Sequence, residues 1–251
     1  MVKIINLVKS FNGHKVLDGI NLTMPTGQIT VVIGKSGVGK SVLLKHIVGL
    51  LKPASGQIIV DGQDISRLRG RQLHEFKQRF AVLFQGGALF DSLNVFENVA
   101  FPLREKTRLP ETEIAQRVRF RLAQMNLTPE VETRLPDELS GGMRKRVALA
   151  RAMIQEPEIM FFDEPVTGLD PPMTNTVFHL ISRTHQESGY TALMVSHDIP
   201  EVFSVAHQVA MLHQGRIVAA GTPEAIHNHP DPVVQSFIRG EVDFLEDKTI
   251  L

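Results

Sequence analysis

The alternation of hydrophobic and polar positions divides the chain into two strand-rich parts with a helical part between them. In the first part, short runs with a period of two, or of continuous apolar character, predict strands. These runs are Val2–Val8, Val16–Met24, Gln28–Ile33, Gln57–Val60 and Phe80–Phe84. Asn12-Gly13 is a turn signal between the first two runs. The apolar segment Ser41–Leu51 ends before Pro53 and predicts a buried helix.

Between Gln85 and about Glu156 the pattern becomes mainly helical. Apolar residues that share one helical face are Ile114, Val118, Leu122 and Met125. Asn94 and Glu97 have the spacing of a capped helix start. A further helix, Ser140–Gln155, begins at a glycine pair.

After this part, strands and helices alternate. The predicted elements are the strands Glu158–Phe162 and Tyr190–Val195, the helix Met173–Glu187 between them, the hairpin His207–Leu212 with Arg216–Ala219, and a last helix opened by Pro232. Alternating strands and helices predict an α/β fold with a parallel sheet. We expect one domain over residues 1–240, with a core from 1–85 and 157–221, an inserted helical subdomain at 86–156, and C-terminal helices and a tail at 222–251.

Composition narrows the class of protein. The 251 residues are 43% hydrophobic and 22% charged, which suits a globular core. Equal numbers of basic and acidic residues, 27 each, argue against a nucleic-acid binder. The chain has no Cys, no apolar run of the roughly 18 residues that a membrane helix needs, and no signal-peptide core at its N-terminus. We therefore expect a cytoplasmic protein that reaches a membrane only through a partner.

The segment Gly34-Lys35-Ser36-Gly37-Val38-Gly39-Lys40-Ser41 has the pattern GxxxxGK followed by Ser or Thr, after a predicted strand and before a predicted helix. Glycines allow backbone N–H groups to surround an anion, and the helix start adds a partial positive charge. Lys40 is then expected to reach the β- and γ-phosphates, and the Ser41 hydroxyl to hold Mg²⁺. The pattern predicts a nucleotide-binding phosphate loop.

The apolar strand that ends at Phe162 is followed by Asp163 and Glu164. Acids at the carboxyl end of a buried parallel strand face the crevice where ligands bind. We expect Asp163 to coordinate Mg²⁺ and Glu164 to polarise the attacking water as general base.

Further motifs follow in a fixed order. Leu139-Ser140-Gly141-Gly142-Met143 resembles the signature motif of the ABC (ATP-binding cassette) ATPases, Gln85 their Q-loop glutamine, Gly168-Leu169-Asp170 their D-loop, and His197 their switch histidine. The resemblance extends from Phe11 to about Gly221. It implies a P-loop NTPase of the ABC type, with a RecA-like parallel-sheet core, an N-terminal antiparallel β subdomain and an inserted helical subdomain.

The resemblance also implies roles for individual residues, with ATP and Mg²⁺ as cofactors. The catalytic set is Glu164, His197, Gln85 and Lys40, and the metal set is Ser41, Gln85 and Asp163. The nucleotide-binding set is Phe11, Val16, Gly34, Lys35, Ser36, Gly37, Val38, Gly39, Lys40, Ser41, Val42, Ser140, Gly141, Gly142 and Asp170. Phe11 is expected to stack on adenine, although core packing is the more common role of a lone Phe. Ser140 with two glycines forms a second anion-binding helix start, which in this family faces a nucleotide held by another copy. We therefore expect a head-to-tail homodimer.

Two positions depart from the common form of the family, Met143 in the signature and Val42 after the phosphate loop. Neither change removes a metal ligand or the base, so we still expect catalysis. Arg144, Lys145, Arg146 and Arg151 form a basic cluster on the signature helix. We interpret this cluster as a solvated helix face, with docking to an acidic partner as the alternative.

Residues 86–105, from Gly86-Gly87-Ala88-Leu89-Phe90 to Pro102-Leu103-Arg104-Glu105, together with Met143, resemble the ATPases of Mla (maintenance of lipid asymmetry) systems. That branch moves phospholipid between the two membranes of Gram-negative bacteria. The resemblance implies four partners: an integral permease, a periplasmic MCE-domain lipid-binding protein, a small cytoplasmic STAS-domain protein, and phospholipid as transported substrate. It places the chain on the cytoplasmic face of the inner membrane. Phe90, Leu93 and Phe96 are candidate apolar anchors for the permease, with core packing an equal alternative.

Other functions stay open at this point. Within the class, the chain could drive an importer for amino acids or other small solutes. A different class is a soluble ABC protein of DNA repair or translation, but this chain carries one cassette, no long inserted arm and no basic excess. A regulatory cassette without turnover is disfavoured by the presence of Glu164 and His197.

Overall fold

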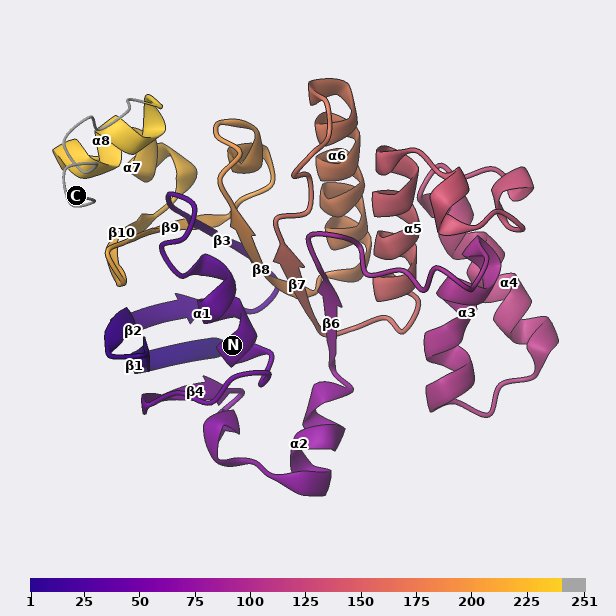
Figure 1. Ribbon diagram of the computed structural model, residues 1–251, viewed down its shortest axis with the longest axis horizontal. Coiled ribbons are helices and arrows are strands. Elements are labelled where there is room, and N and C mark those ends of the chain that lie inside the picture. The colour runs from indigo at the N-terminus through magenta and orange to yellow at the C-terminus, as the bar shows by residue number, and fades with distance from the viewer. Residues whose placement is uncertain (241–251) are drawn as a thin grey trace.

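A computed structural model describes residues 1–240; the tail 241–251, whose role the sequence left open, lies outside the described residues. Within residues 1–240 the strands form two sheets, with helices packed around them (Figure 1). One sheet is antiparallel, in the order β2-β1-β4-β5, and the other has six strands in the order β10-β9-β3-β8-β7-β6. The predicted fold class is therefore confirmed.

The antiparallel sheet comes from the N-terminal part of the chain. Its strands are β1 (Val2–Phe11), β2 (His14–Met24), β4 (Ser55–Val60) and β5 (Gln63–Asp64). The predicted turn between the first two strands is present, and both turn residues have positive φ, 49° at Asn12 and 82° at Gly13. Asn-Gly suits this geometry because both residue types tolerate the left-handed region.

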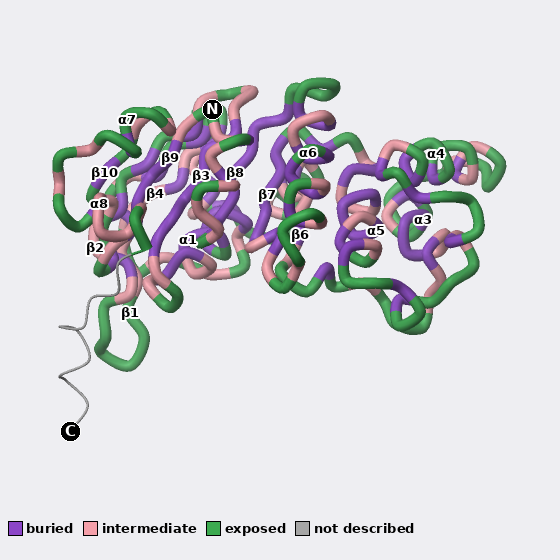
Figure 2. Tube along the Cα trace, turned by 90° about the horizontal axis from the view of Figure 1, so that it is seen from above, coloured by how far each residue is buried: buried purple, intermediate pink, exposed green. Residues whose placement is uncertain are grey.

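The six-stranded sheet forms the centre of the molecule. Its strands are β3 (Ile29–Ile33), β6 (Phe80–Leu83), β7 (Ile159–Asp163), β8 (Thr191–Ser196), β9 (Gln208–His213) and β10 (Arg216–Gly221). Only β10 pairs antiparallel to its neighbour; the other pairings are parallel. Strands β3, β7 and β8 are buried along their whole length, as Figure 2 shows. Their continuous apolar runs reflect burial on both faces.

The two faces of this sheet belong to two hydrophobic cores. Val32 of β3 packs with α1 (Lys40–Ile47) and the antiparallel sheet. Its neighbours Val31 and Ile33 point the other way and pack with the helices of the middle part. Because alternate strand residues face opposite sides, α1 and the middle helices lie on opposite faces of the sheet.

The middle part is helical, as the sequence predicts. Its helices are α3 (Val95–Lys106), α4 (Glu111–Gln124) and α5 (Gly141–Met153), and α6 (Pro171–Ser188) follows between β7 and β8. The expected capping box begins α3: the Glu97 amide donates to Asn94 Oδ1 (2.8 Å), and the Asn94 amide donates to Glu97 Oε2 (2.9 Å). None of the helices within residues 1–240 has the length and apolar character needed to cross a bilayer.

Several elements differ from the predicted ones. Helix α1 ends at Ile47 rather than at Leu51 because Gly49 adopts a positive φ of 72°. Helix α2 (Gly70–Lys77) was missed; it is short, and its apolar side chains are Leu73 and Phe76, of which Phe76 is buried. Helix α7 (Pro223–His227) lies in the region 222–251 where helices were expected, although its bounds were not predicted, and α8 (Pro232–Ile238) begins where Pro232 predicted. Short 3-10 helices lie at Ile65–Arg67, Pro129–Val131, Pro136–Glu138 and Glu201–Ser204.

Candidate nucleotide site

The phosphate loop lies between β3 and α1, at the carboxyl edge of the sheet. A side chain at Gly34 would collide with the carbonyl oxygen of Leu212, so the backbone can approach only with glycine there. Gly37 and Gly39 have positive φ of 79° and 107°, which turns the loop into the first helical turn. A Cβ on Gly39 would lie 3.0 Å from Cγ1 of Val16, so Val16 lies against the loop; its contact with a nucleotide stays a prediction.

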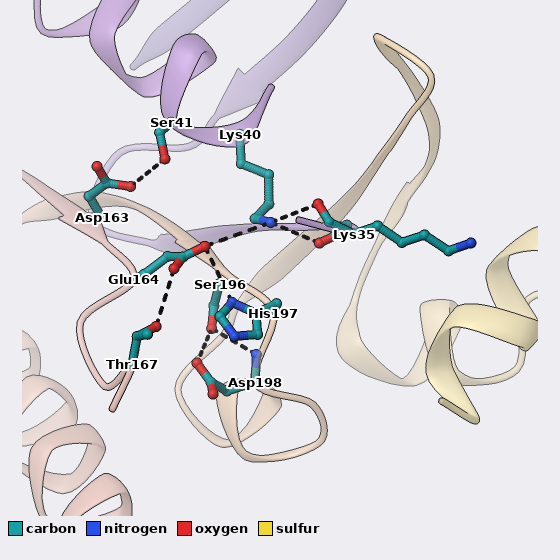
Figure 3. A network of polar contacts seen from close by, with 10 residues as sticks. Lys35, Lys40, Ser41, Asp163, Glu164, Thr167, Ser196, His197 and Asp198 are labelled. Carbon is teal, nitrogen blue, oxygen red and sulfur yellow. Dashed lines mark hydrogen bonds and ion pairs between the residues drawn. The ribbon is translucent and has the colours of Figure 1, made fainter. Parts of the chain in front are cut away.

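Lys40 is the first residue of α1 and is buried. Its ammonium donates to the carbonyls of Gly34 (2.8 Å) and Lys35 (3.0 Å), as Figure 3 shows. Burial lowers the pKa of Lys40 below its usual value, and the carboxylates of Glu164 and Asp163 oppose this effect. The loop therefore holds a desolvated cation against its own backbone carbonyls. A buried positive charge in this position favours binding of a multiply charged phosphate.

A cavity of about 270 Å³ opens at this loop. Its lining consists of Ser36, Gly37, Gly39, Lys40, Ser41 and Val42 together with Gln85 and Glu164. Asp163 ends β7 and is buried, and its Oδ1 accepts a hydrogen bond of 2.8 Å from Ser41 Oγ. A hydroxyl and a carboxylate in contact provide the hard oxygen ligands that Mg²⁺ prefers. The donor set thus fits the predicted metal, and the assignment of Ser41, Gln85 and Asp163 as ligands stays a prediction.

Glu164 follows Asp163 and has a positive φ of 48°, unusual for a residue with a side chain. Its Oε1 lies 3.8 Å from the Lys40 ammonium and 3.3 Å from His197 Nδ1, and its Oε2 accepts a bond of 3.2 Å from Thr167 Oγ1 (Figure 3). A carboxylate has no proton to give, so the contact with His197 requires the proton on Nδ1. The structure brings the expected base and the expected switch histidine into one network.

His197 itself is exposed, in the loop after β8. The flanking residues hold that loop: Ser196 Oγ donates to Asp198 Oδ2 (3.0 Å), and the Asp198 amide donates to Ser196 Oγ (3.1 Å). The ring of His197 therefore lies beside Glu164 on a short turn, which is held by the hydrogen bonds between Ser196 and Asp198.

The signature segment lies elsewhere. Ser140 caps α5, because its Oγ accepts from the Met143 amide (3.3 Å), and Ser140 and Gly141 are exposed. Gly142 packs on α6, where an added Cβ would lie 2.8 Å from Met173 Sδ. Helix α5 packs on the face of the sheet opposite to α1, so one chain does not join the two glycine segments in a single cavity.

Two further predicted contacts are not tested by this arrangement. Phe11 ends β1 and is 41% exposed, with the Lys9 ammonium 5.1 Å from its ring centroid, so it is not a core residue. Asp170 caps α6 by accepting from the Met173 amide (2.8 Å). Their contacts with a nucleotide stay predictions.

The interpretation of the basic cluster as a solvated face is wrong for most of its members. Arg144 is exposed, but Lys145 is buried and donates to the carbonyl of Gln85. The half-buried Arg146 donates to the carbonyl of Asn126 (2.7 Å), and the half-buried Arg151 donates to that of Gly87 (2.9 Å). Long cationic side chains can satisfy buried carbonyls while their stems pack on apolar surface, which a sequence pattern does not reveal.

Residues that the sequence analysis missed complete the network. Thr167 lies three positions after Glu164 and Asp198 lies directly after His197, so position relative to a catalytic residue was a usable signal for both. No comparable signal marks Lys145, since its partner Gln85 is 60 positions away.

Comparison with known proteins agrees with this geometry. Residues 17–167 match the family model described as ABC transporter. The chain is 42% identical over 243 residues to the "Intermembrane phospholipid transport system ATP-binding protein MlaF" of Haemophilus influenzae, which covers 97% of this chain and 92% of the relative. It is 41% identical over 239 residues to the "Probable ribonucleotide transport ATP-binding protein mkl" of Mycobacterium tuberculosis, covering 95% of this chain and 66% of that protein.

Among solved structures, the cassette MJ0796, described as a dimeric post-hydrolysis state bound to ADP and Pi, matches with a TM-score of 0.82 and 29% identity. The match covers 89% of this chain and 99% of MJ0796. The family model spans more than half of the sequence, and the fold and the phosphate loop agree with it. This chain belongs to the ABC transporter family and is one of its ATP-binding, ATP-hydrolysing cassettes.

Proposed function

We propose that this chain is the ATP-hydrolysing subunit of a complex that moves phospholipid between the inner and outer membranes of a Gram-negative bacterium. The observation that carries the proposal is the 42% identity with a phospholipid-transport ATPase over 97% of this chain. The segment 86–105 supports it, because that is where the sequence most resembles the Mla branch.

In the proposed mechanism, the phosphate loop binds the nucleotide and Lys40 binds its β- and γ-phosphates. Glu164 orients the attacking water and accepts its proton. His197, which lies beside the Glu164 carboxylate, contacts the γ-phosphate. Ser41, Asp163 and Gln85 would hold Mg²⁺, which neutralises phosphate charge when bound. Support comes from Glu164 Oε1, which lies 3.8 Å from the Lys40 ammonium as an ion pair and 3.3 Å from His197 Nδ1.

The working unit in this proposal is a head-to-tail homodimer. The exposed Ser140 and Gly141 of one copy would face the nucleotide on the phosphate loop of the other, since their own loop lies across the sheet. The similar cassette MJ0796 is described as dimeric. Symmetry then gives two equivalent shared sites.

A permease would dock beside the Q-loop, at the face that carries two aromatic rings. Phe90 and Phe101 are 42% and 37% exposed, and their ring centroids lie 4.8 Å apart. Leu93 is half-buried, and Phe96 packs partly against the core, which makes them weaker anchors than the sequence indicated. With no basic excess, we expect a protein partner rather than nucleic acid.

The remaining partners follow from the Mla-type assignment. They are the periplasmic MCE-domain protein and the small cytoplasmic STAS-domain protein, with the ATPase on the cytoplasmic face of the inner membrane. The test is to purify the tagged chain with its membrane partners and identify bound lipid by mass spectrometry. We expect phospholipid and an MCE-domain protein; copurification with an amino-acid permease instead would overturn the proposal.

A small-solute importer is the second candidate, because the mycobacterial relative is named for ribonucleotide transport at nearly the same identity, 41% against 42%. The same purified complex separates the two. Reconstituted in vesicles, a lipid transporter should move labelled phospholipid and leave a labelled nucleotide outside, and a solute importer should do the reverse.

A further inference from the structure

Helix α5 holds the Q-loop through side chains on successive turns. The Lys145 ammonium donates to the carbonyl of Gln85 at the start of the loop. Six residues further along the helix, Arg151 Nη2 donates to the carbonyls of Gly87 (2.9 Å) and Ala88 (2.7 Å). The loop backbone is therefore bound to this helix at both ends of the segment 85–88.

The loop also packs closely on the helix between these two cations. Gly87 has a positive φ of 75°, and a Cβ added there would lie 3.2 Å from that of Ala148. The Phe90 ring continues the contact, with the Arg151 guanidinium 5.5 Å from its centroid. Such tight contact lets the loop and the helix move only together.

Lys145 is the member of this contact nearest to the chemistry. It is 7% exposed, and burial lowers the pKa of its ammonium, while the carboxylates of Glu164, Asp198 and Asp163 act against that effect. A buried cation costs free energy unless it is paired or hydrogen-bonded. Here the compensating groups are a Q-loop carbonyl and the field of the catalytic carboxylates.

Gln85 and Lys145, which are joined by this hydrogen bond, lie near different parts of the site. Gln85 lines the cavity of its own phosphate loop, beside Glu164. Lys145 lies only five positions after Ser140, in the first turns of the helix that Ser140 caps. A shift of the signature segment would therefore be passed through Lys145 to the backbone of Gln85.

We propose that Lys145 is a positioning residue. It fixes the position of Gln85 relative to Glu164 and joins the Q-loop to the signature helix α5. The inference rests on the role proposed above for Gln85 and does not depend on the lipid cargo. Removing the ammonium frees the Gln85 backbone, and a displacement of about 1 Å at a reacting group can cost on the order of a hundredfold in rate.

The test compares Lys145→Met with Arg144→Met in the purified full chain. Arg144 is exposed and adjacent on the same helix, so its variant controls for loss of a cation from α5. We expect Lys145→Met to lower kcat at least about tenfold, to raise the Mg²⁺ concentration for half-maximal activity, and to leave the affinity for a fluorescent ATP analogue within about twofold. Arg144→Met should match the wild type, and Lys145→Gln, which keeps an N–H donor, should recover part of the lost turnover.

A merely structural role predicts a different result. If Lys145→Met lost ATP binding in parallel with kcat, or kept the wild-type kcat, the inference would be overturned. Gln85→Ala is measured alongside: a wild-type kcat for Gln85→Ala removes the role proposed for that residue and the inference with it. Impaired Gln85→Ala with normal Lys145→Met overturns the inference alone.

Discussion

The phosphate loop and the signature segment are both glycine-containing starts of helices, yet the structure equips them very differently. The phosphate loop opens α1 from Gly39, in the left-handed region and without a side-chain cap, with the buried Lys40 as the first helical residue. The signature segment opens α5 with an ordinary Ser140 cap, and its first residues are exposed. The start of α1 carries a buried ammonium group, whereas the start of α5 exposes backbone amides and the Ser140 hydroxyl.

The difference extends to the neighbours of each segment. Around the phosphate loop, Asp163, Glu164 and His197 come from the ends of parallel strands; Asp163 accepts from Ser41, and Glu164 contacts His197. Around the signature, the close contacts are apolar: Leu169 lies 3.5 Å from a Cβ built on Gly141, and Met173 lies against Gly142. The first segment lies among the groups proposed for catalysis, whereas the second would supply anion contacts to the nucleotide of another copy in the proposed dimer.

The largest effect should come from Glu164→Gln. The amide keeps the size of the side chain but cannot accept a proton, so kcat should fall by about 10²- to 10⁴-fold. ATP binding should persist because Lys40 and the loop are untouched. ATPase assays and nucleotide-binding measurements on the same preparation check both parts; full ATPase activity in this variant would remove the role given to Glu164.

Lys40→Ala should act on binding. The hydrogen bonds of a charged group contribute roughly 1.5–3 kcal/mol each, so ATP affinity should fall by about 10- to 100-fold. Lys45→Ala is the matched control, since Lys45 is exposed on the same helix. Titration with a fluorescent ATP analogue gives the result, and equal affinities for the two variants would contradict it.

Ser140→Ala tests the other half of the comparison. The substitution removes the cap of α5 and, in the proposed dimer, one hydrogen-bond donor to the nucleotide of the other copy. We therefore expect kcat to fall about tenfold, with the ATP affinity of the isolated chain unchanged. The lost cap should also cost about 1 kcal/mol of folding stability.

Thr222→Ala is the control for that stability term, because Thr222 caps α7 by accepting from the Ala225 amide (3.2 Å). Both variants should melt earlier, but only Ser140→Ala should lose turnover. If both kept the wild-type kcat, the signature segment would not contact nucleotide in trans.

The two segments were also unequally predictable from sequence. The phosphate loop and the Asn94–Glu97 capping box are local patterns, because the residues that form each one lie within eight positions of one another. Both appear where expected. The same holds for Asp163 and Glu164, which a buried apolar strand places at the sheet edge.

What the sequence did not reveal depends on contacts between distant segments. Lys145 stands in a run of basic residues that looks solvated, and only the packing of the Q-loop, 60 positions earlier, buries it. Helix α2 is short and mostly exposed, and Leu73 and Phe76 are the apolar side chains it offers as a signal. A pattern along one segment reports which face is apolar, but not which polar group a folded neighbour will supply.

The smallest predicted effect concerns Thr167, which contacts Glu164 beside the phosphate loop of the same chain. Thr167 Oγ1 donates to Glu164 Oε2, while His197 contacts the other oxygen. Thr167→Val removes one hydrogen bond of the Glu164 carboxylate and leaves its contacts with His197 and Lys40, so kcat should fall only roughly threefold to tenfold. Thr167→Ser keeps the hydroxyl and should keep the wild-type kcat. Equal kcat values in the Val and Ser variants would mean that His197 and Lys40 position Glu164 without help from Thr167.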